Sequence, residues 1–189
     1  MSSLCWVFGY GSLMWDPGFR VIESTTARLD GYARSFCLRS TRYRGTAETP
    51  GLVLGLDADP DAHCTGIALR FAPEERDSIL SYLRERELVT HAYREAILPI
   101  ALEDGRRVEA LTYVMRRDHV QYAGGLAPCE QARIISGAHG MRGPNADYLF
   151  NTTRHLAEFG MSDAALDALS EDVRRLLRDP ADDNGKQRN

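Results

Sequence analysis

The chain has 189 residues, of which 43% are hydrophobic and 26% are charged, and its formal net charge is −4 at pH 7. These totals predict one globular domain with a core of ordinary size, and the acidic balance without a basic stripe argues against a nucleic-acid partner. No apolar run approaches the roughly 18 residues of a membrane-spanning helix. The first residues, MSSLCWVFG, lack the basic region and cleavage site of a signal peptide, so we expect a cytoplasmic protein without membrane contact.

Strand-like segments occupy the first two-thirds of the chain. A short buried strand is predicted at residues 6–10, and a broken alternating segment at residues 27–38 predicts a strand with a bend at Gly31. The apolar runs at residues 51–56 and 65–71 predict two more strands, because the polar stretch DADPDAH between them is typical of a turn.

A helix and a hairpin follow. Pro73 stands at the first position of a helix predicted over residues 73–87, and the two glutamates after it are a typical helix start signal. Residues 93–102 and 107–115 are strand-like runs joined by EDGR. An Asp-Gly pair between such runs predicts a β-hairpin.

The last third of the chain is predicted to be helical. Gly160 is the expected stop of one helix, and Ser162 is the expected cap of the next. The predicted helices cover residues 128–136, 145–159 and 163–178.

Strands first and helices last predict an α+β fold, with a mainly antiparallel sheet or small barrel and helices packed at one side. We expect a single domain over residues 1–179 and a disordered polar tail at residues 180–189.

The cysteines and histidines predict no metal site. The four cysteines form no CxxC pair, and the five histidines show no HExxH or His-x-His spacing. We expect all the cysteines to be buried free thiols of a reducing compartment. They are Cys5, Cys37, Cys64 and Cys129.

The stretch VFGYGSLMW, near the start of the chain, predicts a turn that holds a ligand. Gly9 and Gly11 allow a ligand to approach the main chain, and successive N–H groups with the Ser12 hydroxyl suit a carboxylate or phosphate. The stretch lacks the lysine of a P-loop, the third glycine of a dinucleotide fingerprint and the glycine of a nucleophile elbow. The alternative is a strand-end turn whose glycines serve only the backbone, with Trp6, Tyr10 and Trp15 as packing residues.

A carboxylate at the end of the first long helix is the second candidate. Ile79, Leu83 and Glu87 are spaced four apart, so Glu87 continues the apolar face and Glu85 does not. Burial would raise the pKa of Glu87 and suit it to general base work. A close Arg86 guanidinium would lower that pKa, so a purely structural ion pair is the alternative.

Together these features resemble a known family, the ChaC-type γ-glutamylcyclotransferases. The resemblance runs in order over most of the chain, from about residue 5 to about residue 159, and the elements that carry it are GYGSLMW, PGLVLGLD, YLRERELVTHAY and GMRGPNADYL. It implies a compact β-barrel with flanking helices. It also implies the cleavage of glutathione to 5-oxoproline and cysteinylglycine, without a cofactor.

The resemblance also implies roles for particular residues. It makes Glu87 the general base and places Tyr148 near the site. The implied substrate loop consists of Gly9, Tyr10, Gly11, Ser12, Leu13 and Met14. The chain departs from several relatives at His91 and Ala92, where they carry two glycines, and this affects the expected substrate selectivity.

Three other functions are open. The first is a cyclotransferase for other γ-glutamyl amines or amino acids. The second is an acyl-transfer enzyme with Ser12 or a cysteine as nucleophile, and the third is a γ-glutamyl metabolite-binding domain without catalysis. An arginine of the loop RSTRYRGTAETPG is a candidate for the second carboxylate of glutathione, and a solvated polar loop is the alternative.

Overall fold

The computed structural model describes residues 4–179, which form two compact units. The first unit contains residues 4–35 and 54–122, and the second contains residues 36–53 and 123–179. The single domain expected over residues 1–179 stays a prediction. The predicted disordered tail lies outside the described residues.

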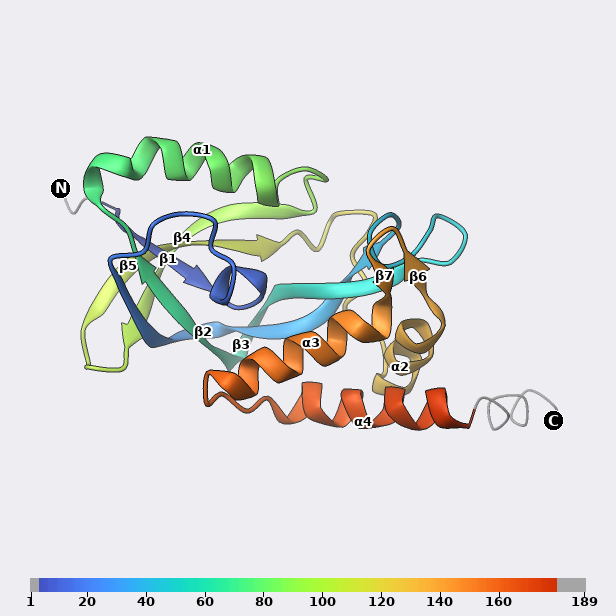
Figure 1. Ribbon diagram of the computed structural model, residues 1–189. Coiled ribbons are helices and arrows are strands. Elements are labelled where there is room, and N and C mark those ends of the chain that lie inside the picture. Colours follow the sequence, from blue (N-terminus) through green and yellow to red (C-terminus); the bar gives the residue numbers. More distant parts are fainter. Residues whose placement is uncertain (1–3, 180–189) are drawn as a thin grey trace. The chain divides into compact units, whose positions relative to one another are not determined.

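The strands form a small closed barrel (Figure 1). Its order is β1-β3-β2-β4-β5. The pairs β1–β3, β2–β4 and β4–β5 are antiparallel, and β1 and β5 run parallel with Val7 opposite Leu111. The strands are β1 (Trp6–Gly9), β2 (Glu23–Ser40), β3 (Gly51–Arg70), β4 (Tyr93–Leu102) and β5 (Arg107–Met115). The α+β prediction with a small barrel and packed helices is confirmed.

One strand prediction is wrong. The stretch DADPDAH does not form a turn, because β3 runs without interruption from Gly51 to Arg70. Residues 58–63 of this strand are exposed or half-exposed, so their polar side chains reflect contact with water and not a reversal of the chain. By contrast, β4 and β5 have the bounds predicted for the hairpin, and Gly31 adopts a positive φ of 82° within β2.

The barrel interior holds an apolar cluster drawn from all its strands, including Phe8, Leu29, Leu56, Ile100 and Val114. Successive residues of a strand point to opposite faces. Tyr113, the neighbour of Val114, therefore lies on the outer face of the barrel, and it is nevertheless buried at 2% exposure.

Helix α1 (Arg76–Glu87) lies along this outer face beside the β4–β5 hairpin (Figure 1). The helix predicted from Pro73 begins with a short 3-10 turn, η2 (Pro73–Glu75), so α1 itself starts at Arg76. The predicted apolar stripe is confirmed, since Ile79, Leu80 and Leu83 are buried. Arg84 fastens the helix to β4 by donating two hydrogen bonds to the Glu95 carboxylate, at 2.7 and 2.8 Å.

The second unit is built mainly from helices α2 (Pro128–Gly137), α3 (Asn145–Glu158) and α4 (Ala164–Arg178), which pack on one another. The short strands β6 (His139–Gly140) and β7 (Gly143–Pro144) follow α2 in the chain and pair with each other. The buried Asn145 side chain binds both the N–H and the carbonyl of Leu52, so an amide takes the place of a strand neighbour.

The ends of α3 and α4 test two sequence predictions. Gly160 follows α3 with a φ of 69°, which confirms it as the stop signal. The predicted cap Ser162 is wrong. Asp163 caps α4, because its carboxylate accepts a hydrogen bond from the N–H of Leu166 at 3.2 Å.

The cysteine prediction is confirmed only in part. All four thiols are free, and Cys37 and Cys64 are buried, but Cys5 is half-buried and Cys129 is exposed. Cys129 lies in the first turn of α2, where the apolar pattern did not reveal its outward direction. Within residues 4–179 no three His, Cys, Asp or Glu side chains cluster as metal ligands would. In the same range no helix combines the length and the apolar character that crossing a membrane requires.

Candidate active site

The glycine turn follows β1 directly. Its residues Ser12–Met14 form a 3-10 turn, η1, with Gly11 at its start. A methyl group on Gly9 would lie 3.2 Å from the backbone nitrogen of Met14, so Gly9 lets the chain fold back on itself. A methyl group on Gly11 would meet only Leu54 Cδ2, at an ordinary 3.4 Å. A close approach of the backbone therefore explains Gly9, and no such close approach is found at Gly11.

Arg34 of β2 stabilises the glycine turn. Its guanidinium donates to the carbonyl oxygens of Tyr10 at 2.7 Å and of Thr65 at 2.6 Å. The side chains of Leu13 and Met14 are buried, at 6% and 4% exposure. Their side chains are therefore part of the packing, and the N–H of Met14 already donates to the carbonyl oxygen of Gly11 at 2.9 Å.

Tyr10 ties the turn to β5. Its hydroxyl donates to the carbonyl oxygen of Tyr113 at 2.9 Å. Trp6 is buried, and Tyr10 and Trp15 are half-buried. This agrees with the expected packing role of the aromatic residues.

Glu87 is the last residue of α1, and its side chain is 20% exposed. It continues the buried stripe as predicted, while Glu85 is exposed. Burial raises the pKa of the Glu87 carboxyl, and the charge of Arg86 lowers it without cancelling the effect of burial. Both influences expected from the sequence are thus present, and burial is the larger.

Arg86 connects Glu87 with the turn. Its Nε lies 3.2 Å from Glu87 Oε1, and its Nη2 donates to the Ser12 hydroxyl at 3.1 Å. Its Nη1 donates to the carbonyl of Asp16 at 2.7 Å and to the Tyr82 hydroxyl at 3.0 Å. One guanidinium therefore holds the carboxylate and the glycine turn in a common frame. Sequence reasoning treated Arg86 only as a charge near Glu87 and missed these contacts.

Among the described residues, Ser12 has no partner that would activate it as a nucleophile. Among residues 4–179 its hydroxyl is hydrogen-bonded to Arg86, which is a donor only, and to no histidine. This arrangement argues against acyl transfer through Ser12.

Tyr148 lies in the second unit, on α3. Its ring meets Phe36 edge-on at 5.8 Å, and the Arg44 guanidinium lies 5.4 Å from its centroid. Arg44 also donates to the carbonyl oxygens of Arg142 and Pro144, so this arginine is held by the protein and is not simply solvated. The nearness of Tyr148 to the other site residues stays a prediction.

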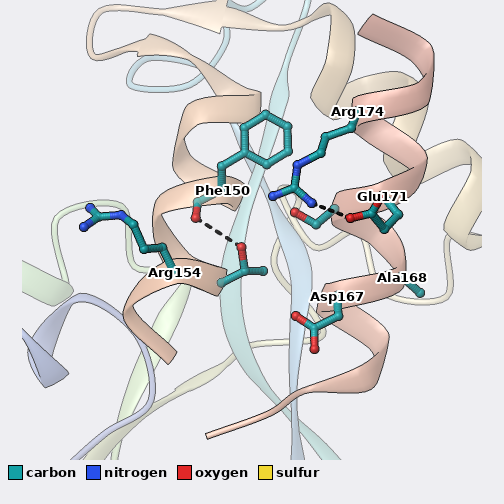
Figure 2. Close-up of a pocket in the computed structure, with 8 residues that line it drawn as sticks. Phe150, Arg154, Asp167, Ala168, Glu171 and Arg174 are labelled. Carbon is teal, nitrogen blue, oxygen red and sulfur yellow. Dashed lines mark hydrogen bonds and ion pairs between the residues drawn. The ribbon is translucent and has the colours of Figure 1, made fainter. Parts of the chain in front are cut away.

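A cavity of about 470 Å³ lies in the second unit between α3 and α4 (Figure 2). Two of its charged groups bind each other, since Arg174 donates to Glu171 at 2.7 Å, and the Arg174 guanidinium lies 4.8 Å from the centroid of Phe150. None of the predicted site residues lines it. We therefore assign the candidate site to Glu87 and the glycine turn, and not to this cavity.

Comparison with known proteins identifies the family of the chain. The family model described as ChaC-like protein matches residues 5–176. The chain belongs to the ChaC family. The loop after Glu87, where a departure from several relatives is expected, turns at His91 with a φ of 57°, a conformation that favours glycine.

Two curated relatives of the ChaC chain illustrate the match. A glutathione-specific γ-glutamylcyclotransferase of Escherichia coli is 40% identical over 172 residues, which are 91% of this chain and 74% of that protein. A γ-glutamylcyclotransferase 2-3 of Arabidopsis thaliana is 35% identical over 91% of this chain and 89% of its own length. Among solved structures, a yeast γ-glutamylcyclotransferase specific to glutathione has a TM-score of 0.81 at 25% identity, covering 90% of this chain and 96% of that one.

Proposed function

We propose that this chain is a γ-glutamylcyclotransferase that cleaves glutathione to 5-oxoproline and cysteinylglycine, with Glu87 as the general acid and base. The observation that carries the proposal is the buried Glu87 carboxylate, joined through Arg86 to a glycine turn. The names of the E. coli and yeast relatives support the choice of glutathione.

The reaction needs little more than orientation and one proton path. The α-amine of the γ-glutamyl group attacks its own γ-carbonyl carbon and closes a five-membered ring. Because nucleophile and electrophile belong to one molecule, holding them in a reactive geometry contributes roughly 7–11 kcal/mol. The C–N bond to cysteinylglycine then breaks, and its nitrogen must receive a proton.

Glu87 supplies the proton path. Its carboxylate accepts a proton from the attacking amine and returns it to the departing nitrogen. Burial raises its pKa, which brings the carboxyl closer to the amine in proton affinity and makes both transfers easier. The substrate carries its own electrophile, so the mechanism uses no cofactor.

The glycine turn binds the α-carboxylate of the substrate through its N–H groups and the Ser12 hydroxyl. Gly11→Val tests this role, because a methyl at position 11 has room and, in this proposal, a larger side chain would hinder a ligand bound to the main chain of the turn. We expect KM for glutathione to rise about tenfold, equal to about 1.4 kcal/mol of binding. An unchanged KM in a well-folded Gly11→Val protein would remove the turn from substrate binding.

Arg86→Gln tests the frame that Arg86 provides. Loss of the guanidinium removes the charge that lowers the pKa of Glu87, so the acidic limb of the kcat profile should move to higher pH. Misplacement of the carboxylate should also lower kcat on the plateau by roughly 10–100-fold.

The matched control is Arg76→Gln. Arg76 lies on the same helix, and its side chain is paired with Asp77. This variant should keep both the plateau and the limb of the wild type. An Arg86→Gln profile whose acidic limb stays at the wild-type pH would contradict the proposed effect of Arg86 on the Glu87 carboxylate.

Product analysis with two substrates tests the function as a whole. With glutathione we expect 5-oxoproline and cysteinylglycine, and with γ-glutamyl-alanine a much lower rate. The reverse preference would assign the chain to other γ-glutamyl compounds, and binding of glutathione without turnover would make it a binding domain. A contribution of Tyr148 to the site, a cytoplasmic location and the lack of a nucleic-acid partner remain predictions.

A further inference from the structure

The Tyr113 hydroxyl is buried and has no hydrogen-bond partner among the described residues. The whole residue is 2% exposed. Leaving a buried hydroxyl unpaired costs about 1–3 kcal/mol, and such groups are rare in native proteins. A phenylalanine would fill the same volume without this penalty, so the hydroxyl calls for an explanation other than stability.

Tyr113 lies next to both halves of the candidate site. Its carbonyl accepts the hydrogen bond from Tyr10, the tyrosine of the glycine turn. Tyr113 lies on β5 and is paired with Glu95 on β4. The side chain of Glu95 binds Arg84 of α1, so Tyr113 shares the outer face that α1 covers. Glu87 at the end of that helix is close enough for its charge to act on the phenol.

These surroundings keep the phenol neutral. The pKa of Tyr113 is raised, first by burial and then by the negative charges of Glu95 and Glu87, and the positive charge of Arg84 only partly opposes them. Glu95 already accepts two hydrogen bonds from Arg84 and does not bind the phenol. Tyr113 therefore keeps its proton and remains an O–H donor within range of the Glu87 charge.

We propose that the Tyr113 hydroxyl donates a hydrogen bond to the γ-carbonyl oxygen of the bound γ-glutamyl group. This inference rests on the proposed function. As the amine forms the new C–N bond, the π electron pair of the carbonyl moves onto its oxygen, and the phenol stabilises that charge without giving up its proton. When the bond to cysteinylglycine breaks, the pair returns and the carbonyl of 5-oxoproline forms.

Such a donor is paired only when substrate is bound, which explains why its hydroxyl is unpaired in the free protein. Donors aimed at a developing oxyanion are typically worth about 10²–10³-fold in kcat. Tyr113 thus supplies a side-chain donor for the charge that develops on the γ-carbonyl oxygen.

Tyr113→Phe separates this role from a structural one. We expect kcat for 5-oxoproline formation to fall by about 10²-fold or more, while Tm stays equal or rises because no existing hydrogen bond is lost. The acidic limb of the pH profile should not move. A limb shifted to higher pH would mean that the phenol serves Glu87, and wild-type kcat would mean that it serves neither; both results would overturn the inference.

Tyr122→Phe is the matched control. Its hydroxyl donates to Asp57 Oδ2 at 2.8 Å, so this variant should lose stability and keep kcat. An assay of the wild-type enzyme beside both variants tests the proposed function separately from the role of Tyr113. Absence of 5-oxoproline from the wild type would refute the proposed function, whereas an active wild type with an equally active Tyr113→Phe would refute only the role of Tyr113.

Discussion

Glu87→Gln is expected to lower kcat for 5-oxoproline formation by at least about 10²-fold, the lower end of the usual range for general acid–base catalysis. The amide keeps the size of the side chain and fills the same space at the end of α1, but it cannot accept the proton of the attacking amine. Glutathione should still bind, because the glycine turn is unchanged. Steady-state kinetics and calorimetric titration with glutathione measure the two effects separately.

The same variant should be more stable than the wild type near neutral pH. Burial raises the pKa of Glu87 above its ordinary value of 4.5, so ionisation of this carboxyl opposes folding. The stability linked to the protonated form is present below the unfolded pKa and is lost as pH rises through the folded pKa. Since glutamine does not ionise, the gain in Tm should be visible at neutral pH and should vanish in acid.

Glu85→Gln is the control for both measurements. Glu85 lies two residues earlier on the same helix and is exposed. The control should leave kcat and Tm close to the wild type. Near-normal turnover in Glu87→Gln would remove Glu87 from the mechanism, and a Tm gain that grows in acid would contradict the direction of its pKa shift.

Gly66→Ala is expected to cause a large loss of stability near the site. A methyl carbon at position 66 would lie 2.8 Å from Cζ of the buried Phe8 and closer still to the carbonyl oxygen of Gly9. Neither neighbour can move freely, because one is a core side chain and the other is the backbone that enters the glycine turn. Overpacking of this kind typically costs about 1–3 kcal/mol, and the displaced turn should also raise KM for glutathione.

Thermal unfolding and steady-state kinetics check this prediction. For a chain of this size each kcal/mol lowers Tm by about 2–4 °C. Gly137→Ala is the control, because no atom lies within 4 Å of the added methyl. A Gly66→Ala protein that unfolds at the wild-type temperature with an unchanged KM would show that β3 does not support the turn as closely as the structure indicates.

Local patterns predicted those parts of the fold that depend on short-range chemistry. The Asp-Gly pair between two apolar runs defined the β4–β5 hairpin to the residue, and Pro73 marked the approach to α1. The prediction failed at DADPDAH because a polar stretch has two causes. A turn and a solvent-exposed part of a long strand both select polar residues, and only the partners in space distinguish them.

The candidate site also shows that local patterns do not predict contacts between residues far apart in the sequence. Helical spacing alone placed Glu87 on the buried face, and the structure confirms that burial. The contact of Arg86 with Ser12 joins residues 74 positions apart, and no periodicity reports such a pairing. Tyr113 was also missed, because a tyrosine inside an apolar strand is typical of a core, and its unpaired hydroxyl is visible only when all neighbours are known.

The fate of solvent oxygen tests most directly whether this chain closes a ring within its substrate. Glutathione is incubated with the protein in ¹⁸O-labelled water, and the products are separated and weighed by mass spectrometry. The account predicts unlabelled 5-oxoproline together with cysteinylglycine, because the α-amine and not water attacks the γ-carbonyl. Glutamate carrying ¹⁸O in its γ-carboxylate would contradict it and would show that the chain hydrolyses the bond instead.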